Sequence, residues 1–160
     1  MAKVLDIQPN DERELVLARL LDAPVEKVFR CWTDPKVMTR WFTPPPWTTP
    51  KVELDLRPGG ANLVLMRGPN GEEVPNRGVY LEVVENRRLV FTDAYVRAWE
   101  PSPKPFMTVT LTFEPEGDKT RYIARVAHWT LEDKKAHEQM GFDTGWGICA
   151  DQLEATARSL

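Results

Sequence analysis

The 160-residue chain holds only two histidines, and one of them has an acidic residue that could orient it. A histidine such as His128, hydrogen-bonded across a sheet to Asp93, can act as a general base. We expect a structural role for His128 in preference to catalysis, because partly buried histidines are common without any catalytic task. The second histidine, His137, lies among two lysines and a glutamate, a composition typical of a solvated helix face.

The other reactive side chains give little support for nucleophilic or metal chemistry. Cys31 and Cys149 are expected on helices as small buried groups, and neither has an activating base nearby in the sequence. The chain has no His-x-His, Cys-x-x-Cys or His-Glu-x-x-His spacing. We therefore expect no metal site and no bound cofactor.

Charge and hydropathy exclude two classes of partner. Lys and Arg number 21 against 24 Asp and Glu, which leaves a net charge of -3 and no positive field to attract nucleic acid or an anionic membrane. Charges or prolines interrupt every apolar run, and the first thirty residues show no secretory leader pattern. We expect a cytoplasmic protein with neither a nucleic-acid nor a membrane partner.

Proline and glycine turns delimit the elements that must position these groups. Residues 1–11 are predicted to form a flexible N-terminal arm, and residues 12–160 a single domain. Two short helices are expected to begin at Pro24 and Pro35, and a long terminal helix at the capping box Thr130–Asp133, with a kink near Met140–Gly147. Apolar and alternating runs predict seven strands, over Glu14–Leu21, Lys51–Leu56, Ala61–Arg67, Gly78–Val84, Arg88–Ala98, Phe106–Glu114 and Thr120–Trp129.

This order resembles the helix-grip fold of the START-like, or SRPBCC, superfamily, to which the birch-pollen-allergen-like and polyketide-cyclase-like proteins belong. The resemblance implies an α+β fold in which a curved antiparallel sheet of about seven strands wraps around a long C-terminal helix. Local sequence is similar to the branch related to the activator of heat-shock-protein-90 ATPase. The residues that carry this similarity are Trp41-Phe42, Pro58-Gly59-Gly60, Met66 to Pro69, Arg88 to Thr92, His137 to Trp146, and Gln152-Leu153.

In such a fold the interior lies between the sheet and the terminal helix, and alternate strand residues face it. Parity places Asn62, Asp93, Tyr95 and His128 inward as polar groups on a mostly apolar face. Buried polar groups must pair with one another, with water or with a ligand. The residues expected to line a ligand cavity are Trp41, Trp47, Asn62, Val64, Met66, Phe91, Asp93, Tyr95, Val109, Leu111, His128, Phe142 and Trp146.

Three functions follow from this arrangement. The favoured one is a domain that binds a small hydrophobic molecule between the sheet and the C-terminal helix. The resemblance also implies two alternatives. One is an interaction module like the chaperone activator, with a chaperone or a second copy of the chain as partner. The other is a polyketide cyclase- or aromatase-like enzyme that uses His128 and Asp93.

Overall fold

The computed structural model describes residues 1–160 as an eight-stranded antiparallel sheet with four helices. In spatial order the strands are β1 (Lys3–Val4), β2 (Glu14–Leu21), β10 (Lys119–His128), β9 (Met107–Glu116), β6 (Arg88–Thr92), β5 (Glu73–Val84), β4 (Ala61–Arg67) and β3 (Thr48–Leu54). A separate two-stranded ribbon consists of β7 (Tyr95–Arg97) and β8 (Glu100–Pro101). The helices are α1 (Val25–Thr33), α2 (Pro35–Met38), α3 (Leu131–Gln139) and α4 (Phe142–Arg158).

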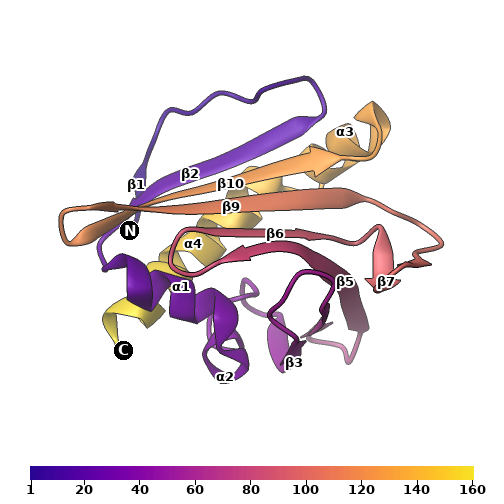
Figure 1. Ribbon diagram of the computed structural model, residues 1–160, viewed down its shortest axis with the longest axis horizontal. Helices are drawn as coiled ribbons and strands as arrows, with labels where there is room; N and C mark the ends of the chain where they lie inside the picture. The colour runs from indigo at the N-terminus through magenta and orange to yellow at the C-terminus, as the bar shows by residue number, and fades with distance from the viewer.

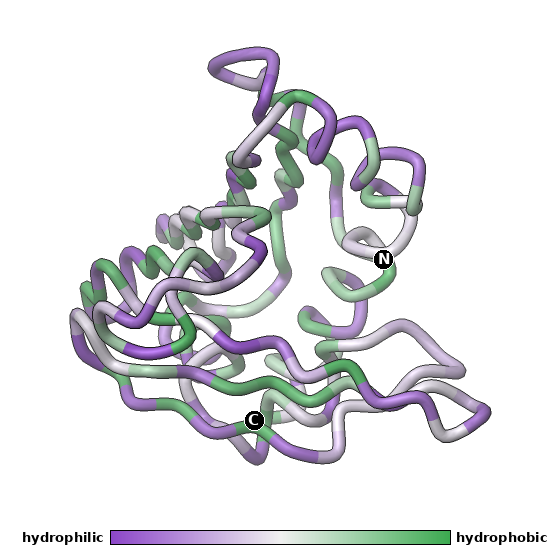
Figure 2. The backbone as a smooth tube through the Cα atoms, turned by 90° about the vertical axis from the view of Figure 1, so that its right-hand side faces the viewer, coloured by the Kyte–Doolittle hydropathy of each residue, from purple (hydrophilic) through white to green (hydrophobic).

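The sheet is curved, and the C-terminal helix α4 crosses it obliquely (Figure 1). Hydrophilic turns lie at the periphery of the chain trace (Figure 2). The expected α+β fold, with a curved antiparallel sheet against a long terminal helix and two short helices after the first long strand, is confirmed. The sheet has eight strands instead of about seven because β1 adds an edge strand. No helix is both long enough and apolar enough to cross a bilayer.

The predicted alternation of β9 and β10 is confirmed. In β9 the side chains of Val109, Leu111 and Phe113 are fully buried, whereas the threonines between them are half-buried. In β10 the inward set begins at Tyr122 and ends at His128, and each member is at most 3% exposed. Period-two alternation therefore assigns the buried face of both central strands correctly.

The N-terminal arm contains a structural element that the sequence pattern does not reveal. Lys3 pairs with Leu20 of β2, and the backbone N–H of Ala2 donates to Asp151 Oδ1 at 2.7 Å. Ala2 is 4% exposed. The first residues of the chain are thus attached both to the sheet edge and to α4.

The single strand predicted over Arg88–Ala98 is wrong. Strand β6 ends at Thr92, and Tyr95 belongs to the β7–β8 ribbon. The break occurs at Asp93, whose Oδ1 accepts hydrogen bonds from the backbone N–H groups of Phe106 and Met107. A side chain that bonds the neighbouring backbone competes with continued strand pairing.

The helix termini follow the predicted chemistry. Thr130 Oγ1 accepts from the backbone N–H of Asp133 at 3.0 Å and caps α3. The terminal helical segment is interrupted at Gly141, which has a φ of 92° and separates α3 from α4. Because this backbone conformation favours glycine, the predicted break near Met140–Gly147 is confirmed.

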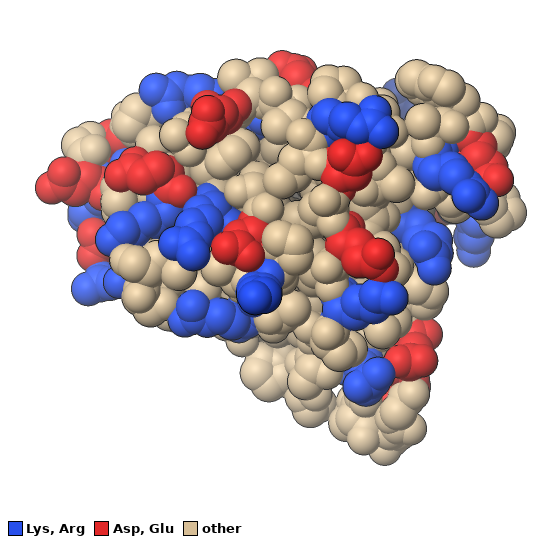
Figure 3. Space-filling view, turned by 60° about the horizontal axis from the view of Figure 1, so that its bottom comes forward, with Lys and Arg blue, Asp and Glu red and all other residues tan.

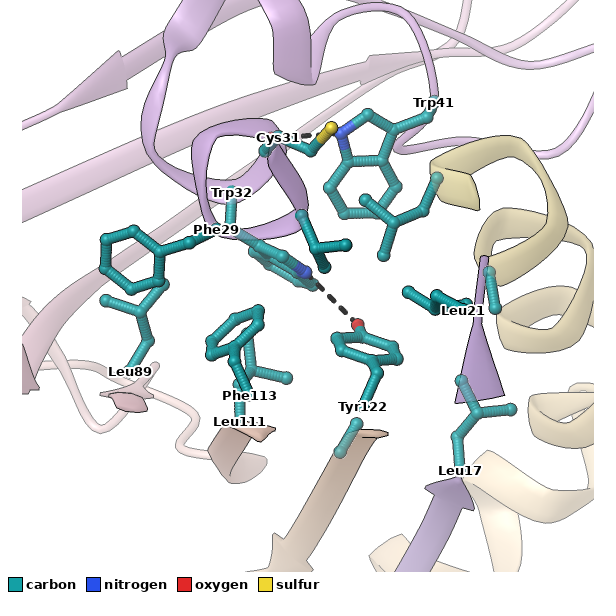
Figure 4. Packing of buried hydrophobic residues seen from close by; sticks show 14 of the residues in the cluster. Leu17, Leu21, Phe29, Cys31, Trp32, Trp41, Leu89, Leu111, Phe113 and Tyr122 are labelled. Atoms are coloured by element: carbon teal, nitrogen blue, oxygen red, sulfur yellow. Dashed lines mark hydrogen bonds between the residues drawn. The ribbon is translucent and has the colours of Figure 1, made fainter. Parts of the chain in front are cut away.

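An aromatic cluster under α1 closes one end of the interior (Figure 4). The indole N–H of Trp32 donates to the hydroxyl of Tyr122 at 3.2 Å, and that of Trp41 donates to the Cys31 carbonyl at 3.0 Å. The rings of Trp32 and Trp41 meet edge to face, with centroids 4.8 Å apart. This end of the molecule is densely packed, and its indole N–H groups are paired.

Two glycine substitutions should have opposite effects on stability. A Cβ atom at Gly78 of β5 would overlap the Thr92 carbonyl oxygen, whereas one at Gly145 of α4 would meet no atom within 4 Å. We expect Gly78→Ala to lower the free energy of unfolding by about 1–3 kcal/mol. Gly145→Ala should raise it by up to about 1 kcal/mol, because alanine favours the helix. Urea unfolding measures both, and an equal or reversed effect would contradict the close approach of β5 and β6.

Candidate functional site: an apolar cavity with a histidine pair

A cavity of about 730 Å³ lies between the sheet and α4. Hydrophobic residues make up 19 of its 33 lining residues, so the wall is mainly apolar. Helices α1 and α2 contribute Trp32 and Met38 at one end, and the junction of α3 and α4 contributes residues at the other. The predicted residues found on this wall are Trp41, Asn62, Val64, Met66, Phe91, Asp93, Val109, Phe142 and Trp146.

Four of the predicted residues lie away from the wall. Trp47 is held in the turn before β3, where its backbone carbonyl accepts from Thr43 Oγ1. Tyr95 packs against Trp99 in the β7–β8 ribbon, with ring centroids 5.7 Å apart. Leu111 is fully buried, and its pairing partner in β6 is Leu89. His128 does not line the cavity and is hydrogen-bonded to His137, which does.

The less favoured alternative, in which Asp93 orients His128, is not what the structure shows. Asp93 Oδ1 lies 2.8 Å from the Phe106 nitrogen and 3.0 Å from the Met107 nitrogen, so this carboxylate closes the loop before β9. His128 has other partners on both ring nitrogens: Nδ1 lies 2.8 Å from the Arg13 carbonyl oxygen, and Nε2 lies 2.8 Å from Nδ1 of His137. The histidine and carboxylate of the cyclase-like alternative are thus not hydrogen-bonded to each other.

His137 is the functional-site candidate that sequence reasoning missed. The prediction that it lies on a solvated face is wrong, because its ring is half-buried and lines the cavity. The ring centroid of His137 lies 5.2 Å from that of Phe106 and 5.0 Å from that of Phe142. Nothing in the local pattern of α3 signals this contact, since the helix has no fully buried residue.

Burial and the neighbouring His128 imidazole lower the pKa of His137 from 6.5 to about 4. The ring is therefore neutral at physiological pH. A neutral imidazole carries one proton and one free lone pair, and so acts as both donor and acceptor.

Two further polar groups on the wall have no hydrogen-bond partner within the protein. The Asn62 side-chain amide and the Tyr80 hydroxyl make no hydrogen bond, although Tyr80 is only 4% exposed. Neither group is sealed from contact, because no fully enclosed side-chain nitrogen or oxygen lacks a partner. Burial raises the pKa of Tyr80, so its hydroxyl keeps its proton and can donate.

The cysteines and the exposed rim complete the wall. Burial raises the pKa values of Cys31 and Cys149 to about 12, which leaves both thiols protonated and poorly nucleophilic.

The lining residues that are exposed mark the mouth of the cavity, and they include Arg77, Lys104 and Met140. No three His, Cys, Asp or Glu side chains come together in a group that could hold a metal ion.

A curved antiparallel sheet that encloses a cavity against its C-terminal helix defines a protein of the START-like, SRPBCC class. Residues 22–158 match the family model described as "Activator of Hsp90 ATPase homolog 1-like protein". The match spans most of the chain, and the chain belongs to this family.

Solved structures with the same fold support the assignment. A crystal structure of a Nitrosomonas europaea protein is 39% identical, with a TM-score of 0.90 over 94% of this chain and 97% of that chain. A Mycobacterium smegmatis protein is 27% identical, with a TM-score of 0.77 over 95% of each chain. A Rhodobacter sphaeroides protein, at 20% identity, shares the fold with a TM-score of 0.84 over 97% of this chain and 99% of that chain. A search of curated protein sequences finds no match.

The lowered pKa of His137 predicts a specific pH dependence of stability. The unfolded chain, with a histidine pKa near 6.5, binds more protons than the folded protein at pH values down to about 4, so stability falls as the pH falls through this window. The substitution His137→Gln removes that contribution. The stability difference, wild type minus His137→Gln, should therefore decrease between about pH 7.5 and about pH 5 in urea unfolding. Parallel stability curves for the two proteins would show that His137 titrates normally.

Proposed function

We propose that this protein binds a small, largely apolar molecule in the cavity between its sheet and α4. The observation that carries the proposal is the volume of about 730 Å³ beside a core cluster of 24 buried residues. Ligand sites in proteins typically have about 300–1,000 Å³ and a mostly apolar wall with a few polar groups. The unpaired Asn62 amide and Tyr80 hydroxyl are such polar groups.

The ring arrangement supports an apolar, flat occupant. Phe91 lies between Trp32 and Tyr80, with ring centroids 5.8 Å and 6.3 Å away respectively. Phe142 and Trp146 lie together on the opposite, helical wall, with centroids 4.9 Å apart. Rings on two walls offer edge and face contacts to an aromatic or alicyclic body.

The two alternative functions have less support. The cyclase-type alternative relied on Asp93 to orient His128, and Asp93 is bonded to the backbone instead. The descriptive name of the family suggests contact with a chaperone. On the face seen in Figure 3, Lys and Arg alternate with Asp and Glu, so this face offers no patch of a single sign on which to argue for such a partner.

Titration with a neutral fluorescent dye tests the proposal. N-phenyl-1-naphthylamine should bind the wild-type protein with an emission increase that saturates. Val64→Phe places a ring into the cavity, because Val64 lines it, and should weaken binding at least about tenfold. The matched control Leu65→Phe adds the same ring to the opposite face of β4, where Leu65 does not line the cavity, and should leave binding unchanged. Absence of saturable binding to the wild type, or equal binding to both variants, would overturn the proposal.

A further inference from the structure

We propose that His137 is the polar anchor of this cavity and selects apolar molecules that carry a hydroxyl group, such as phenols or cyclic alcohols. In this arrangement Nε2 of His137 accepts a hydrogen bond from the hydroxyl of the ligand, while the surrounding rings contact the apolar body. This inference rests on the proposed function, because it names the class of molecule that the same cavity takes.

A chain of hydrogen bonds fixes the protons on both histidines. The Arg13 carbonyl oxygen can only accept, so His128 Nδ1, 2.8 Å away, carries a proton and donates it. In a neutral His128 the other nitrogen, Nε2, is then an acceptor. His137 Nδ1, 2.8 Å from this Nε2, must donate to it. Neutral His137 therefore keeps a free lone pair on Nε2.

That lone pair has no partner within the protein. His137 Nδ1 bonds His128, and no hydrogen bond is made by Nε2. The nitrogen is also not fully enclosed, since every fully enclosed side-chain nitrogen or oxygen has a partner. Because the ring lines the cavity, an occupant can reach the acceptor.

The surroundings of His137 favour a hydroxyl on an aromatic or alicyclic body. Rings of Phe106, Phe142 and Trp146 lie around the imidazole, with centroids 5.2, 5.0 and 6.2 Å from its own. Two nearby polar side chains already have partners: Thr92 Oγ1 accepts from the Ala94 nitrogen, and Cys149 Sγ donates to the Phe42 carbonyl. Nε2 of His137 is thus an available acceptor within a ring-lined part of the wall.

His128 acts as a positioning residue in this scheme. It is 3% exposed, does not line the cavity, and is hydrogen-bonded to His137, which does. Its bond to the Arg13 carbonyl sets its own tautomer and, through Nε2, that of His137. The backbone carbonyl of Arg13, the residue before β2, thereby determines which nitrogen of His137 is left as the acceptor.

A pair of matched probes tests the anchor. The compounds 2-naphthol and 2-methylnaphthalene have nearly the same shape, and only the first donates a hydrogen bond. Calorimetric titration measures the affinity of each compound for the wild-type protein and for His137→Leu. The ratio of the two affinities is then compared between the two proteins. This comparison cancels the difference between the compounds in the free energy of transfer from water to the cavity. We expect the preference for 2-naphthol to fall about fivefold in His137→Leu, the effect of one neutral hydrogen bond.

Phe106→Leu is the matched control, because it removes a ring on the same wall and no hydrogen-bonding atom. It should weaken both probes and leave the ratio unchanged. An unchanged ratio in His137→Leu, with both probes still bound, overturns the anchor and leaves the apolar cavity standing. If neither probe binds the wild type, both the cavity function and the anchor are lost.

A measurement on the unmodified protein tests the proton arrangement. The chain has only two histidines, so nitrogen-15 NMR shows two imidazoles, and His137→Gln assigns them. Near pH 7.5 each ring should carry a proton on Nδ1, Nε2 of His137 should carry none, and 2-naphthol should shift the Nε2 signal of His137. A proton on Nε2 of His137 would overturn the proposal, because that nitrogen would then be a donor.

Discussion

One helix is too narrow to cover the concave face of an eight-stranded sheet, and this mismatch organises the molecule. Eight strands spaced about 4.8 Å apart span roughly 34 Å, whereas a helix with its side chains is about 10–12 Å across. Helix α4 alone therefore leaves space on the concave face. At one end α1 and α2 fill it with Trp32, Trp41 and their neighbours. Toward β4, β5 and β6 the space stays open as the cavity.

The two ends of the interior differ in whether their polar atoms have hydrogen-bond partners within the protein. In the packed end the indole N–H of Trp32 and that of Trp41 both find oxygen partners, and Tyr122 accepts from Trp32. In the open end the Asn62 amide and the Tyr80 hydroxyl are left without protein partners. An unpaired buried polar group costs free energy, and a folded protein retains it mainly where water or a ligand completes the bond. The unpaired amide and hydroxyl groups thus lie in the part of the interior where the proposed ligand would bind.

Sequence patterns predicted the sheet well and the site only in part. Alternation found Asn62, Val64 and Met66 on the cavity wall, because a strand with one buried face must alternate with period two. The prediction failed at Tyr95, because the Asp93 carboxylate bonds the backbone of the following strand and ends β6. Strand β1 was missed because two residues, Lys3 and Val4, show no period. His137 was missed because its burial comes from contacts with other elements and not from an apolar stripe on its own helix.

The position of His137 depends on the break between the last two helices. A straight continuation of α3 into α4 is prevented at Gly141, whose φ of 92° redirects the chain. Helix α3 has no fully buried residue, so little hydrophobic burial holds it in place. The hydrogen bond from His137 to His128 and the ring contact with Phe142 therefore attach α3 to β10 and α4. The same two contacts fix the ring at the cavity wall, so the side chain proposed as the anchor also helps to hold α3 in place.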